Sequence, residues 1–254
     1  MGITFELKDD RVLSIAALAT MVVLAWTYLL RGAGIEMPTM DAGPRQWDLS
    51  DATLIFLMWA VMMVAMMLPS VAKVVLLAAV LDRSRGWLVA ACSTMKFVAG
   101  YLAIWLAFSA AATATQRALD GSGLLSETMS TSNGMLAGSM LVYAGIYEWN
   151  PLKQTCLTHC RAPEHFLARH WWRGPFETGL RHGLFCLGCC WMLMGLLFVG
   201  GLMNIAWIAA ITAAIVVEKT MPRGIWASWI IGTTLILVGV ITLAVPGFDW
   251  TTLF

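Results

Sequence analysis

Side chains that bind soft metals are concentrated in one stretch of this 254-residue sequence. Five of its six cysteines lie between positions 156 and 190, accompanied by histidines at helical spacing from them. The first group consists of Cys156, His159 and Cys160, and the second consists of His182, Cys186, Cys189 and Cys190. Residues three or four apart share one face of a helix, so each group predicts one thiol-rich face.

Thiolate and imidazole groups bind zinc, Cu(I) or iron–sulfur clusters, so two such faces that close on each other predict a metal site. Cys156, Cys160, Cys186 and Cys189 are the ligands we expect first, and Cys190, His159 and His182 are second choices. The motif C-x-x-C-H is absent from the sequence, which excludes covalent c-type haem. A redox pair of thiols and plain packing of cysteines between helices are the alternatives.

Weaker signals lie nearby. His165 and His170 are typical of solvated histidines, and Cys92 stands alone. Met58, Met62 and Met66 repeat every four residues and form one stripe, which is typical of a hydrophobic core and, less commonly, of a copper path.

The composition requires a lipid environment around the elements that carry these residues. The chain is 59% hydrophobic and 12% charged, with a mean hydropathy of +0.76. Such a chain cannot cover its surface with polar groups, and backbone groups in lipid must bond internally, so we expect an all-α polytopic membrane bundle. The net charge of +1 argues neither for nor against a polyanionic partner, but the lack of a Lys/Arg-rich tail or stripe argues against nucleic acid.

Seven apolar segments are predicted to be helices in a single transmembrane domain over residues 1–254. They cover about residues 12–30, 52–81, 88–115, 135–149, 184–199, 203–217 and 225–245. The fifth and sixth segments, which meet at Gly200-Gly201, are expected to form a tight helical hairpin, with a re-entrant arrangement as the alternative. The number of spans falls to six if one segment is re-entrant. The first segment lacks a clean cleavage site and is expected to stay as a helix. A polar loop containing the Cys and His groups is expected at about 150–182.

Basic residues predict the orientation of these spans. Eleven lie on one side: Lys8, Arg11, Arg83, Arg85, Lys153, Arg161, Arg169, Arg173, Arg181, Lys219 and Arg223. The other side has Arg31, Arg45 and Arg117. The richer side is assigned to the cytoplasm, which places the N-terminus and the metal-binding groups there. Lys96 is expected to pair with Glu148 or Glu218, as a structural ion pair or as a gate beside the metal site.

Several motifs resemble those of a bacterial family of uncharacterised function, labelled as predicted metal-binding integral membrane proteins. They are the run Phe56–Ser70, Pro151-Leu152-Lys153 with Cys156, Cys160-Arg161-Ala162-Pro163, Gly179–Gly183 with Cys186, Gly188–Trp191 with Met194, Asn204 and Glu218-Lys219. The resemblance covers roughly residues 50 to 220. It implies an inner-membrane location in a bacterium and supports a metal site between Cys156 and Cys190.

The function expected from these observations is the handling or delivery of a soft metal ion at the cytoplasmic membrane face. Copper is favoured over zinc because the ligands are soft. One alternative is an accessory subunit that binds other membrane-protein subunits. The other is a thiol oxidoreductase that cycles Cys186 and Cys189. No Ser-His-Asp set, phosphate loop or H-E-x-x-H motif is present, so we assign no catalytic residues and expect a protein that is not an enzyme.

Overall fold

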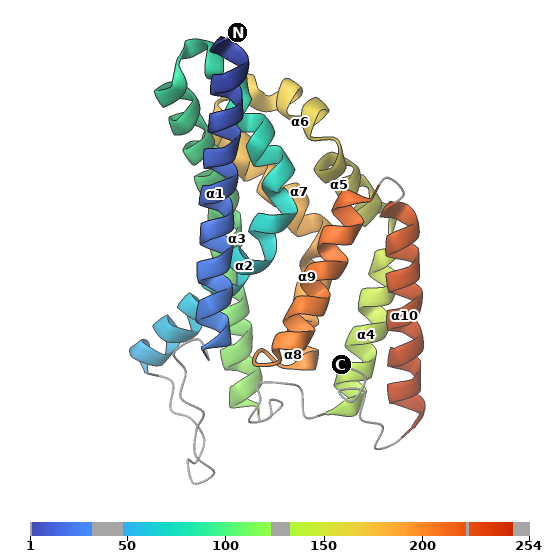
Figure 1. Ribbon diagram of the computed structural model, residues 1–254. Coiled ribbons are helices and arrows are strands. Elements are labelled where there is room, and N and C mark those ends of the chain that lie inside the picture. The colour runs from blue at the N-terminus through green and yellow to red at the C-terminus, as the bar shows by residue number, and fades with distance from the viewer. Residues whose placement is uncertain (1, 32–47, 123–132, 222–223, 246–254) are drawn as a thin grey trace.

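The computed structural model describes residues 2–31, 48–122, 133–221 and 224–245, and every regular element in these ranges is a helix. The all-α fold class is therefore confirmed. In chain order the helices are α1 (Gly2–Leu30), α2 (Leu49–Leu81), η2 (Arg83–Arg85), α3 (Trp87–Gly121), α4 (Gly134–Glu148), α5 (Pro151–Arg161), α6 (Pro163–His170), η3 (Trp171–Arg173), α7 (Pro175–Gly195), α8 (Leu197–Gly200), α9 (Ile205–Thr220) and α10 (Gly224–Ala244). Figure 1 shows the longer helices side by side, with α5 and α6 at the end where the chain begins.

Each of the seven predicted apolar segments coincides with a helix, but the helices differ in length. Four stretches of the described chain are long and apolar enough to cross a membrane: Leu49–Arg85, Trp87–Gly121, Pro175–Gly200 and Ile225–Ala244. The apolar part of α1, Ile15–Leu30, is shorter. At 15 and 16 residues, α4 and α9 are also short. At about 1.5 Å per residue, such helices extend less than the roughly 30 Å of a hydrocarbon core.

The polar segment expected as a loop at 150–182 is helical. Pro151, Pro163 and Pro175 each stand at the first turn of a helix. Proline is favoured there because its missing N–H is not needed and its φ angle is already helical. The Asn150 side chain caps α5 by accepting a hydrogen bond from the Leu152 N–H. The prolines therefore mark the starts of three helices within this polar segment.

Glycines let α7 approach α3 closely enough for their backbones to touch. A Cβ atom added at Gly179 would collide with the carbonyl oxygen of Phe97, and one added at Gly100 would collide with that of Phe176. Small residues at helix crossings allow this approach. As a result, the Tyr101 side chain of α3 reaches the Cys186 side chain of α7.

The methionine stripe of α2 lies in the protein core. Met58, Met62 and Met66 are each at most 1% exposed, and α2 runs without a break through Pro69. The hydrophobic cluster around them includes the buried side chains of α3, α7 and α9. Packing thus accounts for the stripe.

Candidate metal site

Packing of α5 against α7 brings the two predicted cysteine groups together. The Cys160 thiol of α5 shares side-chain hydrogen bonds with the thiols of Cys186 and Cys189 on α7. All three side chains are buried, with at most 8% of their surface exposed. Thiols that are 26 residues or more apart in sequence are thus in contact at one place.

Cys156 lies one turn before Cys160 on α5 and faces the same partner helix. A Cβ atom at Gly188 of α7 would come within 2.8 Å of the Cys156 sulfur. Glycine at this position therefore leaves the space that the Cys156 thiol fills. We call the side chains of Cys156, Cys160, Cys186 and Cys189 the thiol group. Cys156 is half-buried, so it lies at the edge of this group.

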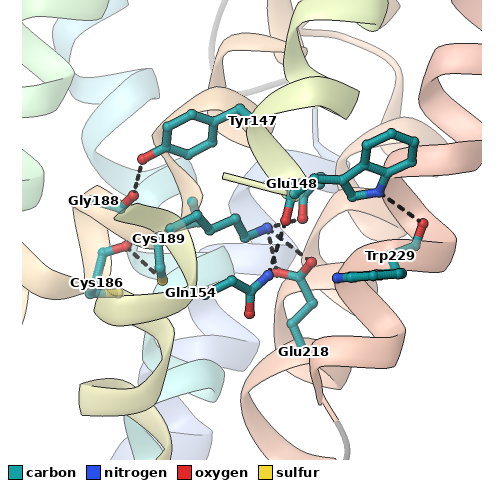
Figure 2. A network of polar contacts seen from close by, with 11 residues as sticks. Tyr147, Glu148, Gln154, Cys186, Gly188, Cys189, Glu218 and Trp229 are labelled. Atoms are coloured by element: carbon teal, nitrogen blue, oxygen red, sulfur yellow. Dashed lines mark hydrogen bonds and ion pairs between the residues drawn. The ribbon is translucent and has the colours of Figure 1, made fainter. Parts of the chain in front are cut away.

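The thiols of Cys189 and Cys190 also contact the backbone of their own helix. Cys189 donates to the Cys186 carbonyl oxygen over 3.1 Å, and Cys190 donates to the same oxygen over 2.9 Å. Figure 2 shows the first of these contacts. Among the described residues, no group of three or more His, Cys, Asp or Glu side chains is arranged to hold a metal ion.

The sulfur of Cys186 is the centre of a polar network from three other helices. Lys219 of α9 donates to it over 2.9 Å and also donates to Ser70 of α2 over 3.1 Å. The Tyr101 hydroxyl of α3 lies 3.1 Å from the same sulfur. Lys219 is 7% exposed, so its ammonium group is withdrawn from water and its charge is directed at the thiol. Sequence reasoning missed this lysine, because nothing in the sequence places the end of α9 beside α7.

The two histidines proposed as second-choice ligands take up other positions. His159 stacks on Phe185, with ring centroids 4.3 Å apart, and its Nδ1 lies 2.8 Å from the Thr155 carbonyl oxygen. His182 is buried among the rings of Phe166, Tyr101 and Phe97, and its Nδ1 atom finds no partner in the described structure. Neither ring joins the thiol contacts described above.

His165, His170 and His159 line a cavity of about 440 Å³. The Nδ1 atom of His170 lies 2.9 Å from the Phe166 carbonyl oxygen of its own helix.

A buried ionic network lies beside the thiols. The Lys153 ammonium binds the Glu148 carboxylate and both carboxylate oxygens of Glu218, the latter at 2.9 Å. All three side chains are at most 2% exposed. Figure 2 shows Glu148 and Glu218 facing each other. The hydroxyl of Tyr147, the residue before Glu148, donates to the Gly188 carbonyl oxygen over 2.5 Å. Sequence reasoning expected Lys96 as the partner of these glutamates, and that prediction was wrong, since Lys96 is exposed.

The signal that could have identified Lys153 is the Asn150-Pro151 start of α5. A helix that starts directly after α4 places its first turn next to Glu148, whereas Lys96 sits on another helix. Burial alone favours a neutral amine, but the carboxylates of Glu218 and Glu148 raise the pKa of Lys153 above its ordinary value. Lys153 therefore remains positively charged although its side chain is buried away from solvent.

The surroundings of the α5 thiols favour their protonated form. Burial, and then the nearby Cys189, raise the pKa of Cys156. Hydrogen bonds with Cys186 and Cys189, together with burial, raise the pKa of Cys160 well above its ordinary value. Both thiols must lose a proton before they bind a metal ion, because the thiolate is the ligand.

Comparison with known proteins identifies the family of the chain. No curated protein matches the chain, and neither does any solved structure. One family profile, PpoB2, with the description "Copper chaperone", matches residues 56–242. The match covers all of the helices that carry the cysteines, Lys219 and the buried ionic network. The chain therefore belongs to this copper chaperone family.

Proposed function

We propose that this protein is a multi-pass membrane protein that binds Cu(I) through thiolates of α5 and α7 and passes it on. The observation that carries this proposal is the contact of Cys160 with Cys186 and Cys189 across two helices, beside the Lys219 ammonium. Thiolates are the soft ligands that select Cu(I). The family description supports copper as the cargo.

Cu(I) matches these residues because it forms stable complexes with only two thiolate ligands. A Cu(I) ion between two thiolates carries a net charge of −1, and Lys219 provides the compensating positive charge. A structural zinc site needs four ligands in a tetrahedral arrangement. The described part of the chain offers no such set, so zinc has no comparable support. The first candidate ligands are Cys160, Cys186 and Cys189. Cys156, at the edge of the thiol group, is the next candidate, and the second choices remain Cys190, His159 and His182.

The membrane location is supported by the apolar surface. Large hydrophobic side chains of α10 are exposed: Ile225, Trp226, Trp229, Ile230, Leu237, Val240, Ile241 and Leu243. Soluble monomers rarely expose apolar patches of this extent. Seven crossings, by α1, α2, α3, α4, α7–α8, α9 and α10, would place α5 and α6 at the same end as the start of the chain, which agrees with the view in Figure 1.

The orientation follows from the same arrangement. With the cytoplasm at the end that carries α5 and α6, the described basic residues of the richer side lie inside and the N-terminus is cytoplasmic. This corresponds to the inner membrane of a bacterium, with copper bound at the cytoplasmic face.

The decisive experiment is elemental analysis of the detergent-purified chain after anaerobic loading with Cu(I). We expect bound copper in the natural protein, loss of that copper in a Cys160→Ser/Cys186→Ser double variant, and retention in Cys92→Ser, whose thiol is exposed and outside the group. Copper binding that is equal in all three proteins overturns the proposal.

A second candidate function, thiol oxidation and reduction, is favoured by the Lys219–Cys186 contact. A cation beside a thiol stabilises the thiolate that attacks disulfides. This function requires Cys186 and Cys189 to alternate between two thiols and one disulfide, with the two electrons and two protons passed to a quinone. Thiol trapping across a series of redox buffers tests it, and a thiol count that is constant over that series removes it.

A further inference from the structure

A cavity of about 400 Å³ opens beside the thiol group, where α2, α5, α6 and α9 meet. It is lined by Ser70, Lys73, Val74, Thr158, Cys160, Arg161, Ala162, Pro163, Lys219, Thr220 and Met221. A volume of this size is typical of sites for small molecules. The cavity is therefore large enough for a ligand much bigger than a bare metal ion.

The charged groups of the cavity are all positive. Lys73, Arg161 and Lys219 line it, and none of its described lining residues is acidic. The Arg161 guanidinium donates to the Met221 carbonyl oxygen, which fixes it at the wall, and Lys219 is held by Ser70. A recess lined by charges of one sign concentrates ions of the opposite sign. The cavity thus favours an anion.

The cavity also contains one soft ligand. Cys160 lines it and at the same time hydrogen-bonds to Cys186 and Cys189 deeper in the protein. Lys219 lines it as well and donates to the Cys186 sulfur. The cavity and the thiol group therefore share two residues, and a copper ion brought into the cavity meets Cys160 first.

From these features we infer that the cavity receives copper as an anionic complex of Cu(I) with a small thiol that carries carboxylate groups. The inference rests on the proposed function and specifies its substrate. Lys73 and Arg161 bind the carboxylates, while the copper ion faces Cys160. A bare Cu(I) ion is a cation and would be repelled by this lining, whereas the thiolate complex is attracted.

Transfer then takes place by ligand exchange without any change in oxidation state. The Cys160 sulfur forms a bond to copper, and a bond between copper and the sulfur of the small thiol breaks. The proton released from the Cys160 thiol goes to the departing thiolate. For a complex with two carrier thiols, a second exchange at Cys186 or Cys189 breaks the bond from copper to the second carrier sulfur. The proton of that cysteine goes to the second departing thiolate, and copper is left between two protein thiolates.

The experiment compares an anionic carrier with a cationic one. The full-length chain is placed in nanodiscs of phosphatidylcholine, and the initial rate of copper uptake is measured from Cu(I)–glutathione and from Cu(I)–cysteamine. The variants are Thr158→Glu, which puts a negative charge in the cavity, and Thr158→Gln as its matched control. Lys73→Gln/Arg161→Gln removes two positive charges, and Lys96→Gln removes an exposed charge elsewhere.

We expect Thr158→Glu and Lys73→Gln/Arg161→Gln to slow uptake from Cu(I)–glutathione about tenfold at low ionic strength, with a smaller effect as salt is added. Uptake from Cu(I)–cysteamine should not fall in these variants, and Thr158→Gln and Lys96→Gln should behave like the natural chain. Equal slowing with both carriers, or none with either, overturns the inference.

Two control measurements distinguish failure of the carrier from failure of the copper site, and a thiol carrier from a lipid. Equilibrium loading with excess Cu(I) is measured first, because a chain that binds no copper at all refutes the proposed function and not only the carrier. Nanodiscs containing phosphatidylglycerol test whether a lipid phosphate is the natural occupant of the cavity. If this lipid abolishes the preference for the glutathione complex in the natural chain, the carrier inference is wrong.

Discussion

The ammonium group of Lys219 donates a hydrogen bond to the sulfur of Cys186 over 2.9 Å, and both side chains are withdrawn from solvent. The two residues come from α9 and α7 and are 33 positions apart in the sequence. In a medium of low polarity, this contact favours a negatively charged sulfur. It gives the thiol group the property that a Cu(I) site needs, which is a positive charge that balances the net charge of −1 of Cu(I) bound to two thiolates.

Replacing Lys219 tests that charge balance. We expect Lys219→Met to weaken Cu(I) affinity by about 10- to 100-fold, the range seen when a partner of a metal ligand is removed. Lys219→Arg keeps the positive charge and should recover part of the affinity. Competition with a Cu(I) chelator gives both values. Equal affinities of the Met variant and the natural chain would show that the lysine does not support the site.

Single substitutions of the thiols should rank them. Cys160→Ser and Cys186→Ser are each expected to lower Cu(I) affinity by at least about 100-fold, because a direct ligand contributes more than its neighbours do. Cys190→Ser should have a smaller effect, since the Cys190 thiol contacts Cys186 and Cys189 of its own helix, whereas Cys160 joins the two helices. The same chelator competition measures all three, and an effect of Cys190→Ser equal to the others contradicts the ranking.

The buried ionic network makes a prediction about stability. Lys153→Met leaves Glu148 and Glu218 facing each other without a counter-charge, and we expect a loss of about 3–5 kcal/mol in the free energy of unfolding. Lys96→Met, at an exposed position, is the matched control and should leave the unfolding midpoint nearly unchanged. Thermal unfolding in one detergent compares the two, and similar midpoints would contradict the prediction.

Close contact of α3 with α7 makes a prediction for Gly179. Gly179→Ala places a Cβ atom against the Phe97 carbonyl oxygen, so the helices must separate at a cost of about 1–3 kcal/mol. Separation also removes Tyr101 from Cys186, so copper affinity should fall. Gly195→Ala on the same helix meets no atom within 4 Å and serves as the control. Thermal unfolding and chelator competition measure the two effects, and a Gly179 variant as stable as the control would show that α3 can move without cost.

The raised pKa of Cys156 predicts slow alkylation near neutral pH. Because the folded protein raises this pKa, the thiolate fraction at a given pH is smaller than in free cysteine, and the rate–pH curve shifts to higher pH. Peptide-resolved mass spectrometry of iodoacetamide labelling measures the curve, with free cysteine in the same buffer as reference. A midpoint at or below that of free cysteine contradicts this assignment.

Local patterns in the sequence determined the helices and the two thiol faces. Apolar segments predicted the positions of the long helices, because helix formation in an apolar chain depends on neighbouring residues. The spacing of Cys156 from Cys160, and of Cys186 from Cys189, likewise predicted which thiols share a face. The prolines at 151, 163 and 175 marked breaks in the chain, although each one starts a helix.

Only the tertiary structure decided which helices meet, and therefore which charges serve the site. Lys153 rather than Lys96 binds the two glutamates, and Lys219 rather than a histidine contacts Cys186. These partners lie on different helices, and their pairing depends on close approaches such as that of Gly179 to Phe97. Packing of this kind involves residues far apart in the chain, so no local pattern in the sequence contains it.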